Sequence, residues 1–150
     1  MSLREPVELL GPSTIGPVHF IAIGGAGMSG VARIYHDMGV DVRGSDQVDS
    51  ANLRDLATAG VQTWVGHDPA HLAGARTVVV SSAIRPDNPE LVEANRLGLR
   101  VWHRSAALAA LMLGREGVSI AGTHGKTTTT GMVATMLDHA GAEPSYVIGS

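Results

Sequence analysis

Two glycine-rich segments of this chain have the residue types and spacing of phosphate-binding loops. The first, Gly25–Gly30, reads GAGMSG and fits the pattern G-x-G-x-x-G. Glycines in such a loop let backbone N–H groups approach a diphosphate closely, and the helix that follows contributes a partial positive charge at its N-terminus. A tight turn from strand to helix that binds nothing has the same composition. The pattern therefore indicates a binding loop only when a strand precedes it and a helix follows it.

The second segment, Gly122–Thr128, reads GTHGKTT. A standard P-loop has four residues between its two glycines, whereas only two separate Gly122 from Gly125. The chemistry of such a loop is nevertheless present. Lys126 offers a positive charge to β- and γ-phosphates, and the hydroxyl of Thr127 is a ligand for Mg²⁺. We therefore predict a second phosphate site here.

Threonines continue beyond this loop through Thr128–Thr130. Because β-branched side chains lose rotamer freedom in a helix, their presence at a helix start favours hydroxyls directed at the loop and its ligand. His124 lies inside the loop. The pattern leaves open whether its ring or only its backbone meets a nucleotide.

Polar residues also follow two of the predicted strands. Asp46 stands about 20 residues after the first glycine loop, where such folds place an acid that receives a ribose hydroxyl; a helix cap or turn is the alternative. Ser81 and Ser82 follow an apolar run and would lie at the carboxyl edge of the sheet, where ligands bind. They would contact phosphate or sugar there, or cap a turn.

Histidine is a common metal ligand, and the chain has seven histidines. His67 and His71 have i,i+4 spacing, but Pro69 lies between them and no glutamate accompanies them as in a zinc-protease helix. We expect histidines scattered over the surface and loops.

Short apolar runs alternate with helical patterns along most of the chain, which predicts a doubly wound parallel α/β sheet. The expected strands are residues 18–24, 40–46, 61–66, 76–83 and 99–102. The expected helices are residues 28–38, 50–59, 88–97 and 105–113, the third of them capped by Asn88.

A second unit is predicted after a charged link at residues 114–117. It would contain a strand at 118–122, the second glycine loop and a helix at 128–139, with one more strand beginning in the run SYVIG (residues 145–149). The expected division is an irregular leader (1–17), a first domain (18–114) and the start of a second domain (115–150).

Composition excludes several classes of protein. The chain is 44% hydrophobic and 17% charged, which predicts a folded protein. A net charge of −3 and 3% aromatic residues argue against a nucleic-acid binder, and the absence of cysteine excludes thiolate chemistry. No apolar run approaches a membrane span and no signal peptide is visible, so we expect a cytoplasmic protein without membrane partners.

Four motifs in order resemble the Mur ligases over a region that runs from about His19 to the last residue. They are HFIAIGGAGMSGVA, GSD, VVVSSAIRPDNPE and AGTHGKTTTTGMVATML. The resemblance implies a Rossmann-like first domain that binds a UDP-sugar rather than NAD, followed by an ATPase domain. It implies ATP-dependent amide formation in peptidoglycan precursor synthesis, with UDP-N-acetylmuramate, ATP and L-alanine as substrates and Mg²⁺ as cofactor.

The resemblance also assigns site residues. Those expected to bind the UDP-sugar are Gly24, Gly25, Ala26, Gly27, Met28, Ser29, Gly30, Asp46, Ser81 and Ser82. Those expected to bind ATP are Gly122, Thr123, His124, Gly125, Lys126, Thr127 and Thr128, with Lys126 catalytic and Thr127 a metal ligand.

Further Mg²⁺ ligands and an amino-acid domain expected of the family are not in the sequence. We therefore expect an N-terminal fragment that binds UDP-sugar, is inactive alone and self-associates through its incomplete second domain. Three alternatives stay open. They are a related ligase that attaches a murein tripeptide to the same UDP-sugar, an NAD-binding oxidoreductase module that uses Gly25–Gly30 and Asp46, and a non-catalytic nucleotide-binding protein complete at 150 residues.

Overall fold

A five-stranded parallel sheet forms the centre of the molecule. The computed structural model describes residues 7–148. Its strands are β1 (Val18–Ile21), β2 (Val42–Asp46), β3 (Gln62–Val65), β4 (Thr77–Val80) and β5 (Arg100–His103). They lie side by side in the order β3-β2-β1-β4-β5, and every neighbouring pair is parallel. The predicted α/β class is confirmed.

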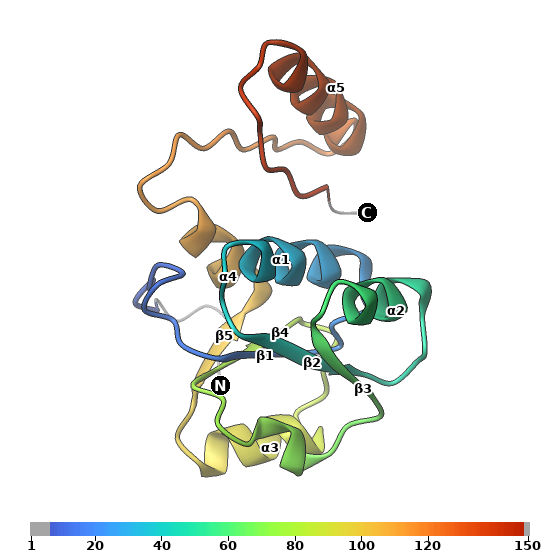
Figure 1. Cartoon of the computed structure of the whole chain (residues 1–150), viewed down its shortest axis with the longest axis vertical. Helices are drawn as coiled ribbons and strands as arrows, with labels where there is room; N and C mark the ends of the chain where they lie inside the picture. Colours follow the sequence, from blue (N-terminus) through green and yellow to red (C-terminus); the bar gives the residue numbers. More distant parts are fainter. Residues whose placement is uncertain (1–6, 149–150) are drawn as a thin grey trace.

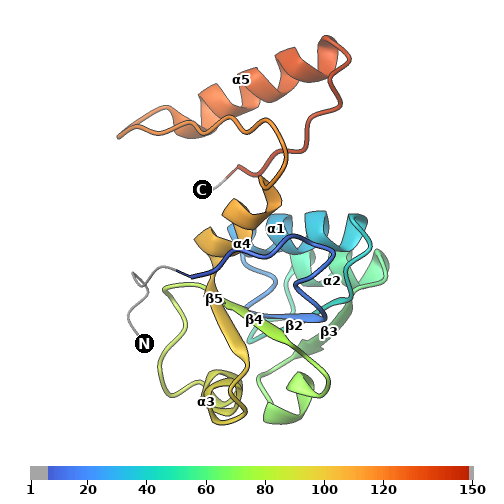
Figure 2. The same cartoon turned by 90° about the vertical axis from the view of Figure 1, so that its left-hand side faces the viewer.

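Helices cover both faces of this sheet. Helices α1 (Ala26–Asp37), α2 (Ala51–Thr58) and α4 (Arg104–Leu111) lie on one face, and α3 (Pro89–Arg96) lies on the other with the 3-10 helix η1 (Pro69–Leu72), as Figures 1 and 2 show. Alternate strand residues supply the two cores. Phe20 and Val79 pack toward α1, α2 and α4, whereas Val78 and Val80 pack toward α3 and η1. The central strands β1 and β4 are buried along their whole length, which explains why both are rich in apolar residues.

The carboxyl ends of β1 and β4 meet where the strand order reverses. From β1 the chain moves outward to β2 and β3, and from β4 it moves outward to β5 on the opposite side. Ligands of doubly wound sheets bind in the crevice at such a point. The first glycine loop follows β1, so the topology places it at this crevice.

Residues 7–17 contain no helix or strand, yet they are packed against the domain. Ile15 is fully buried, and its carbonyl accepts a hydrogen bond from the hydroxyl of Thr77 at 2.9 Å. Val7, Leu9 and Leu10 pack on the same core. This segment is irregular in its backbone but fixed by burial.

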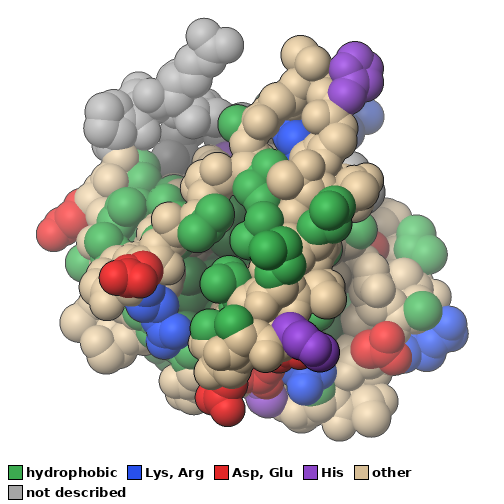
Figure 3. Space-filling model, turned by 90° about the horizontal axis from the view of Figure 1, so that it is seen from above, with side chains coloured by type: hydrophobic (Ala, Val, Ile, Leu, Met, Phe, Trp, Pro, Cys, Tyr) green, Lys and Arg blue, Asp and Glu red, His purple; other side chains and the backbone are tan. Residues whose placement is uncertain are grey.

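Beyond α4 the chain is much more open. Residues 112–125 form no helix or strand, and α5 (Lys126–His139) stands apart from the sheet in Figures 1 and 2. Ala134 is the buried residue of this helix, whereas Met132 and Met136 are 61% and 68% exposed. Hydrophobic side chains consequently lie at the surface in the view of Figure 3.

Both strands predicted in this segment are wrong for the described residues. Residues 118–122 and 145–148 are not strands, and Gly149 lies outside the described part of the chain. The apolar character of these runs was correctly recognised, but a strand also needs a neighbour with which to exchange backbone hydrogen bonds. No described segment supplies one here.

Candidate functional site

The first glycine loop leaves two backbone donors without partners. Helix α1 begins at Ala26 with Gly25 as its N-cap, and no side chain caps it. Among residues 7–148, the amides of Ala26 and Gly27 have no hydrogen-bond acceptor, whereas the amides of Met28 and Ser29 donate to the carbonyl of Gly25. No acidic residue lies in the first turn. Free N–H groups and an uncompensated helix N-terminus form a surface suited to an anion.

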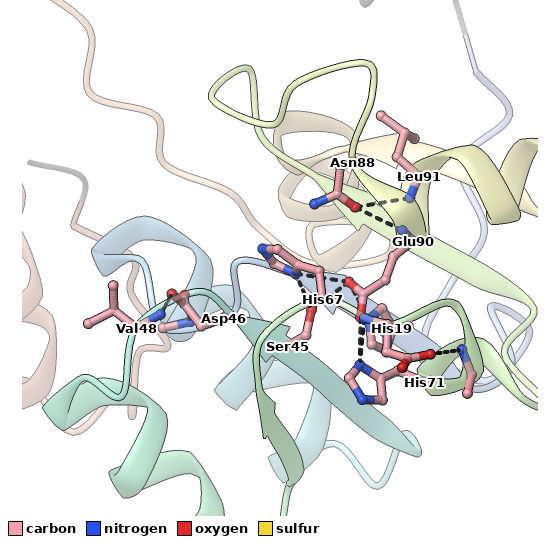
Figure 4. A network of polar contacts seen from close by, with 12 residues as sticks. His19, Ser45, Asp46, Val48, His67, His71, Asn88, Glu90 and Leu91 are labelled. Atoms are coloured by element: carbon pink, nitrogen blue, oxygen red, sulfur yellow. Dashed lines mark hydrogen bonds and ion pairs between the residues drawn. The ribbon is translucent and has the colours of Figure 1, made fainter.

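Asp46 ties this loop to the end of β2. One of its carboxylate oxygens accepts the amide of Gly24 at 2.9 Å, and the other accepts the amide of Val48 at 3.0 Å (Figure 4 labels Asp46 and Val48). The side chain of Asn52 donates to the carbonyl of Gly24 at 2.9 Å. Asp46 therefore positions the loop directly, and a sugar hydroxyl would have to share its oxygens.

Gly24 is required at this point by lack of space. A Cβ atom there would lie 2.6 Å from Oγ of Ser50 and 3.0 Å from Oδ2 of Asp46. Ser50 in turn caps α2 by accepting the amide of Leu53 at 3.2 Å. The glycine thus allows the loop, the strand end and the next helix to meet.

Ser81 and Ser82 follow β4 and reach the same edge of the sheet as the first loop. The carbonyl of Ser81 accepts the amide of Ile84 at 3.1 Å, which forms a turn. Neither hydroxyl has a hydrogen-bond partner among the described residues, so both remain available to a ligand.

A buried polar network lies on the face of the sheet that α3 covers, opposite α1. The sequence patterns do not predict it. Glu90, the second residue of α3, is fully buried. It accepts a hydrogen bond from Ser45 at 2.5 Å, and its oxygens lie 3.2 Å and 2.8 Å from Nδ1 of His67 and His71 (Figure 4). Nε2 of buried His19 lies 3.3 Å from the carboxylate in an ion-pair contact.

Burial raises the pKa of Glu90, but its contacts with His19, Ser45 and His71 outweigh this and lower the pKa from 4.5 to about 2. The expectation of scattered histidines is therefore wrong for His67 and His71, which are 11% and 15% exposed and belong to this network. The i,i+4 spacing was a real signal, but its partner is a glutamate 19 residues beyond His71. The network joins β1, β2, η1 and α3, so it supports the strands that carry the first loop.

Arg104 is a second residue that the sequence pattern did not single out. It is the first residue of α4, and its guanidinium lies against Gly27 of the first loop. An arginine between a strand and an Ala/Leu-rich helix carries no local signature of binding, so only the fold reveals this contact.

The second glycine loop has the predicted shape without comparable support. Gly125 adopts φ 77° and precedes α5, which begins at Lys126. The ammonium of Lys126 donates to the carbonyls of Gly122 and Thr123 at 2.7 and 3.4 Å. Every residue from Gly122 to Thr129 is exposed.

Thr130, the last threonine after this loop, is used differently from the expectation. The hydroxyl of Thr130 donates to the carbonyl of Lys126 at 2.8 Å, a bond within the helix rather than toward the loop. Such back-bonding is common for threonine in helices.

The described residues contain no group of three or more His, Cys, Asp or Glu side chains placed to hold a metal ion. No helix in residues 7–148 is long and apolar enough to cross a membrane.

Similar proteins support the resemblance to the Mur ligases. The chain is 91% identical over 150 residues to a UDP-N-acetylmuramate–L-alanine ligase of Cutibacterium acnes and 58% identical over 149 residues to that of Thermobifida fusca. These alignments include 100% and 99% of this chain but only 32% of each relative. The chain therefore spans about a third of the length of the curated relatives it matches.

Solved structures of ligases are also similar to this chain. A UDP-N-acetylmuramate–alanine ligase from Thermotoga maritima superposes with a TM-score of 0.78 at 34% identity, over 83% of this chain and 29% of that one. A UDP-N-acetylmuramate:L-alanyl-γ-D-glutamyl-meso-diaminopimelate ligase from Neisseria meningitides gives 0.79 at 31% identity, over 91% of this chain and 44% of that one.

A family profile described as the Mur ligase family, catalytic domain, matches residues 17–116. This match covers the whole parallel sheet, its helices and the first glycine loop. The sequence motifs, the fold and the profile agree, and the chain belongs to the Mur ligase family.

Proposed function

We propose that this chain is the UDP-sugar-binding part of an ATP-dependent ligase that joins L-alanine to UDP-N-acetylmuramate. The single observation that carries the proposal is the pair of free amides at Ala26 and Gly27. These amides lie at the switch point of a sheet whose fold is similar to that of a UDP-N-acetylmuramate–alanine ligase. These amides and the N-terminus of α1 would bind the diphosphate. Ser81 and Ser82, across the crevice, would donate to phosphate or sugar.

The second loop would hold ATP in the proposed reaction. The lactyl carboxylate of the sugar attacks the γ-phosphorus, ADP leaves, and the amino group of L-alanine then displaces phosphate from the acyl phosphate to form the amide. Lys126 would place its positive charge on the transferred phosphoryl group. To do so its ammonium must leave the carbonyls of Gly122 and Thr123, which it now contacts.

Mg²⁺ would neutralise phosphate charge in such a reaction. Thr127 offers one hydroxyl ligand, but residues 7–148 bring no cluster of carboxylates to it. The described residues therefore supply one hydroxyl ligand and not a complete metal site.

The proposal includes the domain division near residues 114–117. It is supported by the end of the family match at residue 116 and by the lack of helix or strand in residues 112–125. It also includes self-association through α5, whose Met132 and Met136 are exposed. Sedimentation at increasing concentration tests the latter, and a mass that stays monomeric would refute it.

Calorimetric titration of the chain with UDP-N-acetylmuramate, ATP and NAD tests the main proposal. We expect binding of the UDP-sugar and none of NAD. The oxidoreductase alternative predicts the reverse and is not favoured by the relatives. Amino-acid incorporation by the full-length enzyme, with L-alanine and the murein tripeptide in competition, separates the two ligase alternatives.

A further inference from the structure

Arg104 lies directly over the first glycine loop. A Cβ atom at Gly27 would collide with Nη1 of this arginine and would lie 3.0 Å from its Cζ. The guanidinium therefore occupies the space immediately beside Gly27, whose own amide is free. The glycine allows this approach by lacking a side chain.

Arg104 is an exposed residue whose backbone is positioned by buried contacts on either side of it. Trp102, two residues earlier in β5, is 1% exposed and belongs to the main core. The hydroxyl of Tyr35 in α1 donates to the carbonyl of Ala107 at 2.8 Å, one turn after Arg104, and burial raises the pKa of Tyr35 to about 12. This bond joins α1 to α4 and so sets the distance between Gly27 and Arg104.

The charge of Arg104 has no carboxylate partner in the described part of the chain. Five described arginines (Arg33, Arg43, Arg54, Arg85 and Arg96) each have a carboxylate within 4.0 Å, whereas Arg76, Arg100, Arg104 and Arg115 have none among residues 7–148. Among the described residues Arg104 has no such partner, and the carboxylate of Asp46 is taken by the amides of Gly24 and Val48. A cation beside the positive end of α1 is electrostatically unfavourable unless an anion binds both.

We propose that Arg104 is a side-chain ligand of the diphosphate that the first loop binds, an inference that rests on the proposed function. The free amides of Ala26 and Gly27 would bind the anion from the loop, and the guanidinium would reach it from α4. Guanidinium groups suit this role because their planar set of donors matches phosphate oxygens.

This arrangement changes how substitutions at Gly27 are understood. A larger residue such as valine would displace the Arg104 guanidinium before it blocked a ligand. A loss of affinity in Gly27→Val would therefore combine two effects, and Arg104 has to be tested by itself.

The test measures dissociation constants of the whole chain for UDP-N-acetylmuramate, UDP and uridine in Arg104→Ala, Arg104→Gln and Arg104→Lys. Loss of a charge-assisted hydrogen bond predicts affinities about 10- to 100-fold weaker for UDP and the UDP-sugar in the Ala and Gln variants. Lys should restore part of the affinity, and uridine binding should not change. Arg96→Ala, which removes an exposed arginine on the opposite face, is the matched control and should change affinity by less than about twofold.

Thermal unfolding without ligand separates binding from a structural role. Because Arg104 has no acidic partner among residues 7–148, its removal should leave the midpoint unchanged or slightly raised. Equal affinities of Arg104→Gln and wild type for UDP would overturn the inference, as would an equal loss for uridine and UDP. A wild-type chain that binds no UDP-sugar would instead refute the proposed function, and the inference with it.

Discussion

The two glycine loops of this chain have similar chemistry but very different support. The first follows β1, which is paired on both sides, and Asp46 and Asn52 hold it by hydrogen bonds at 2.9 Å. The second is exposed from Gly122 to Thr128, and among the described residues its lysine donates to carbonyls of its own loop. A loop sequence specifies which atoms can meet a phosphate, whereas the surrounding sheet determines whether they are held ready for it.

The difference begins in the strand before each loop. β1 exchanges hydrogen bonds with β2 and β4, but residues 118–121 pair with no described segment. Preorganised donors bind more tightly because less order has to be created on binding. We therefore expect the first loop to bind its ligand in this chain more readily than the second.

The largest expected effect concerns the buried network beneath the first loop. Glu90→Ala removes the carboxylate that joins Ser45, His67 and His71, and leaves buried polar groups without partners. We expect a loss of about 3–5 kcal/mol in the free energy of unfolding. Urea unfolding followed by tryptophan fluorescence measures this, since Trp64 and Trp102 both lie in the sheet.

The control is Glu93→Ala on the same helix, which removes the partly buried partner of the exposed Arg96 and should change the unfolding curve far less than Glu90→Ala. If both variants unfolded alike, the network would not be what stabilises the strands under the loop.

Acid should weaken the same region. The pKa of Glu90 is about 2 in the folded chain, whereas the ordinary value for a glutamate is 4.5. Its ionised form therefore stabilises the fold. This contribution, about 3 kcal/mol, is fully present above pH 4.5 and is lost as the pH falls toward 2. His19, His67 and His71 face the carboxylate. Unfolding at a series of pH values should show this slope in wild type and a smaller one in Glu90→Gln; equal slopes would contradict the assignment.

A smaller effect is expected from Gly24→Ala. The added methyl group would crowd Ser50 and Asp46, and the loop would lose either its bond to Asp46 or the cap of α2. We expect about 1–2 kcal/mol of destabilisation and weaker UDP-sugar binding. The matched control in the other region is Gly131→Ala in α5, where a Cβ meets nothing within 4 Å. Comparable losses in the two variants would remove the contrast between the regions.

The smallest effect is expected from Lys126→Ala. Its hydrogen bonds stay within the second loop, so affinity for UDP-N-acetylmuramate should change by less than about twofold, while any ATP binding should be lost. Calorimetry with both ligands measures this. A tenfold loss of UDP-sugar affinity would show that the loops are coupled.

Features set by neighbouring residues were predictable from the sequence. Alternating apolar runs indicated the parallel sheet, and Asn88 marked the start of α3, where its side chain accepts the amides of Glu90 and Leu91. Both depend on local periodicity or on a cap within three residues. The resemblance to a family then indicated the ligand of a loop whose pattern alone was ambiguous.

Features that depend on distant segments were missed. The Glu90 network assembles residues from β1, β2, the loop after β3 and η1, and the contact between Arg104 and Gly27 joins α4 to α1. The strand expected at residues 118–122 failed for the same reason, because an apolar run does not specify its partner. Sequence reasoning therefore located the loops but not what holds them.

Backbone NMR of the isotopically labelled chain, titrated with UDP-N-acetylmuramate, tests the central claim most directly. We predict saturable shifts of the Ala26 and Gly27 amide resonances while those of Gly122–Thr128 stay in place. Unmoved Ala26 and Gly27 resonances at saturating ligand would contradict the claim that these free amides bind the diphosphate.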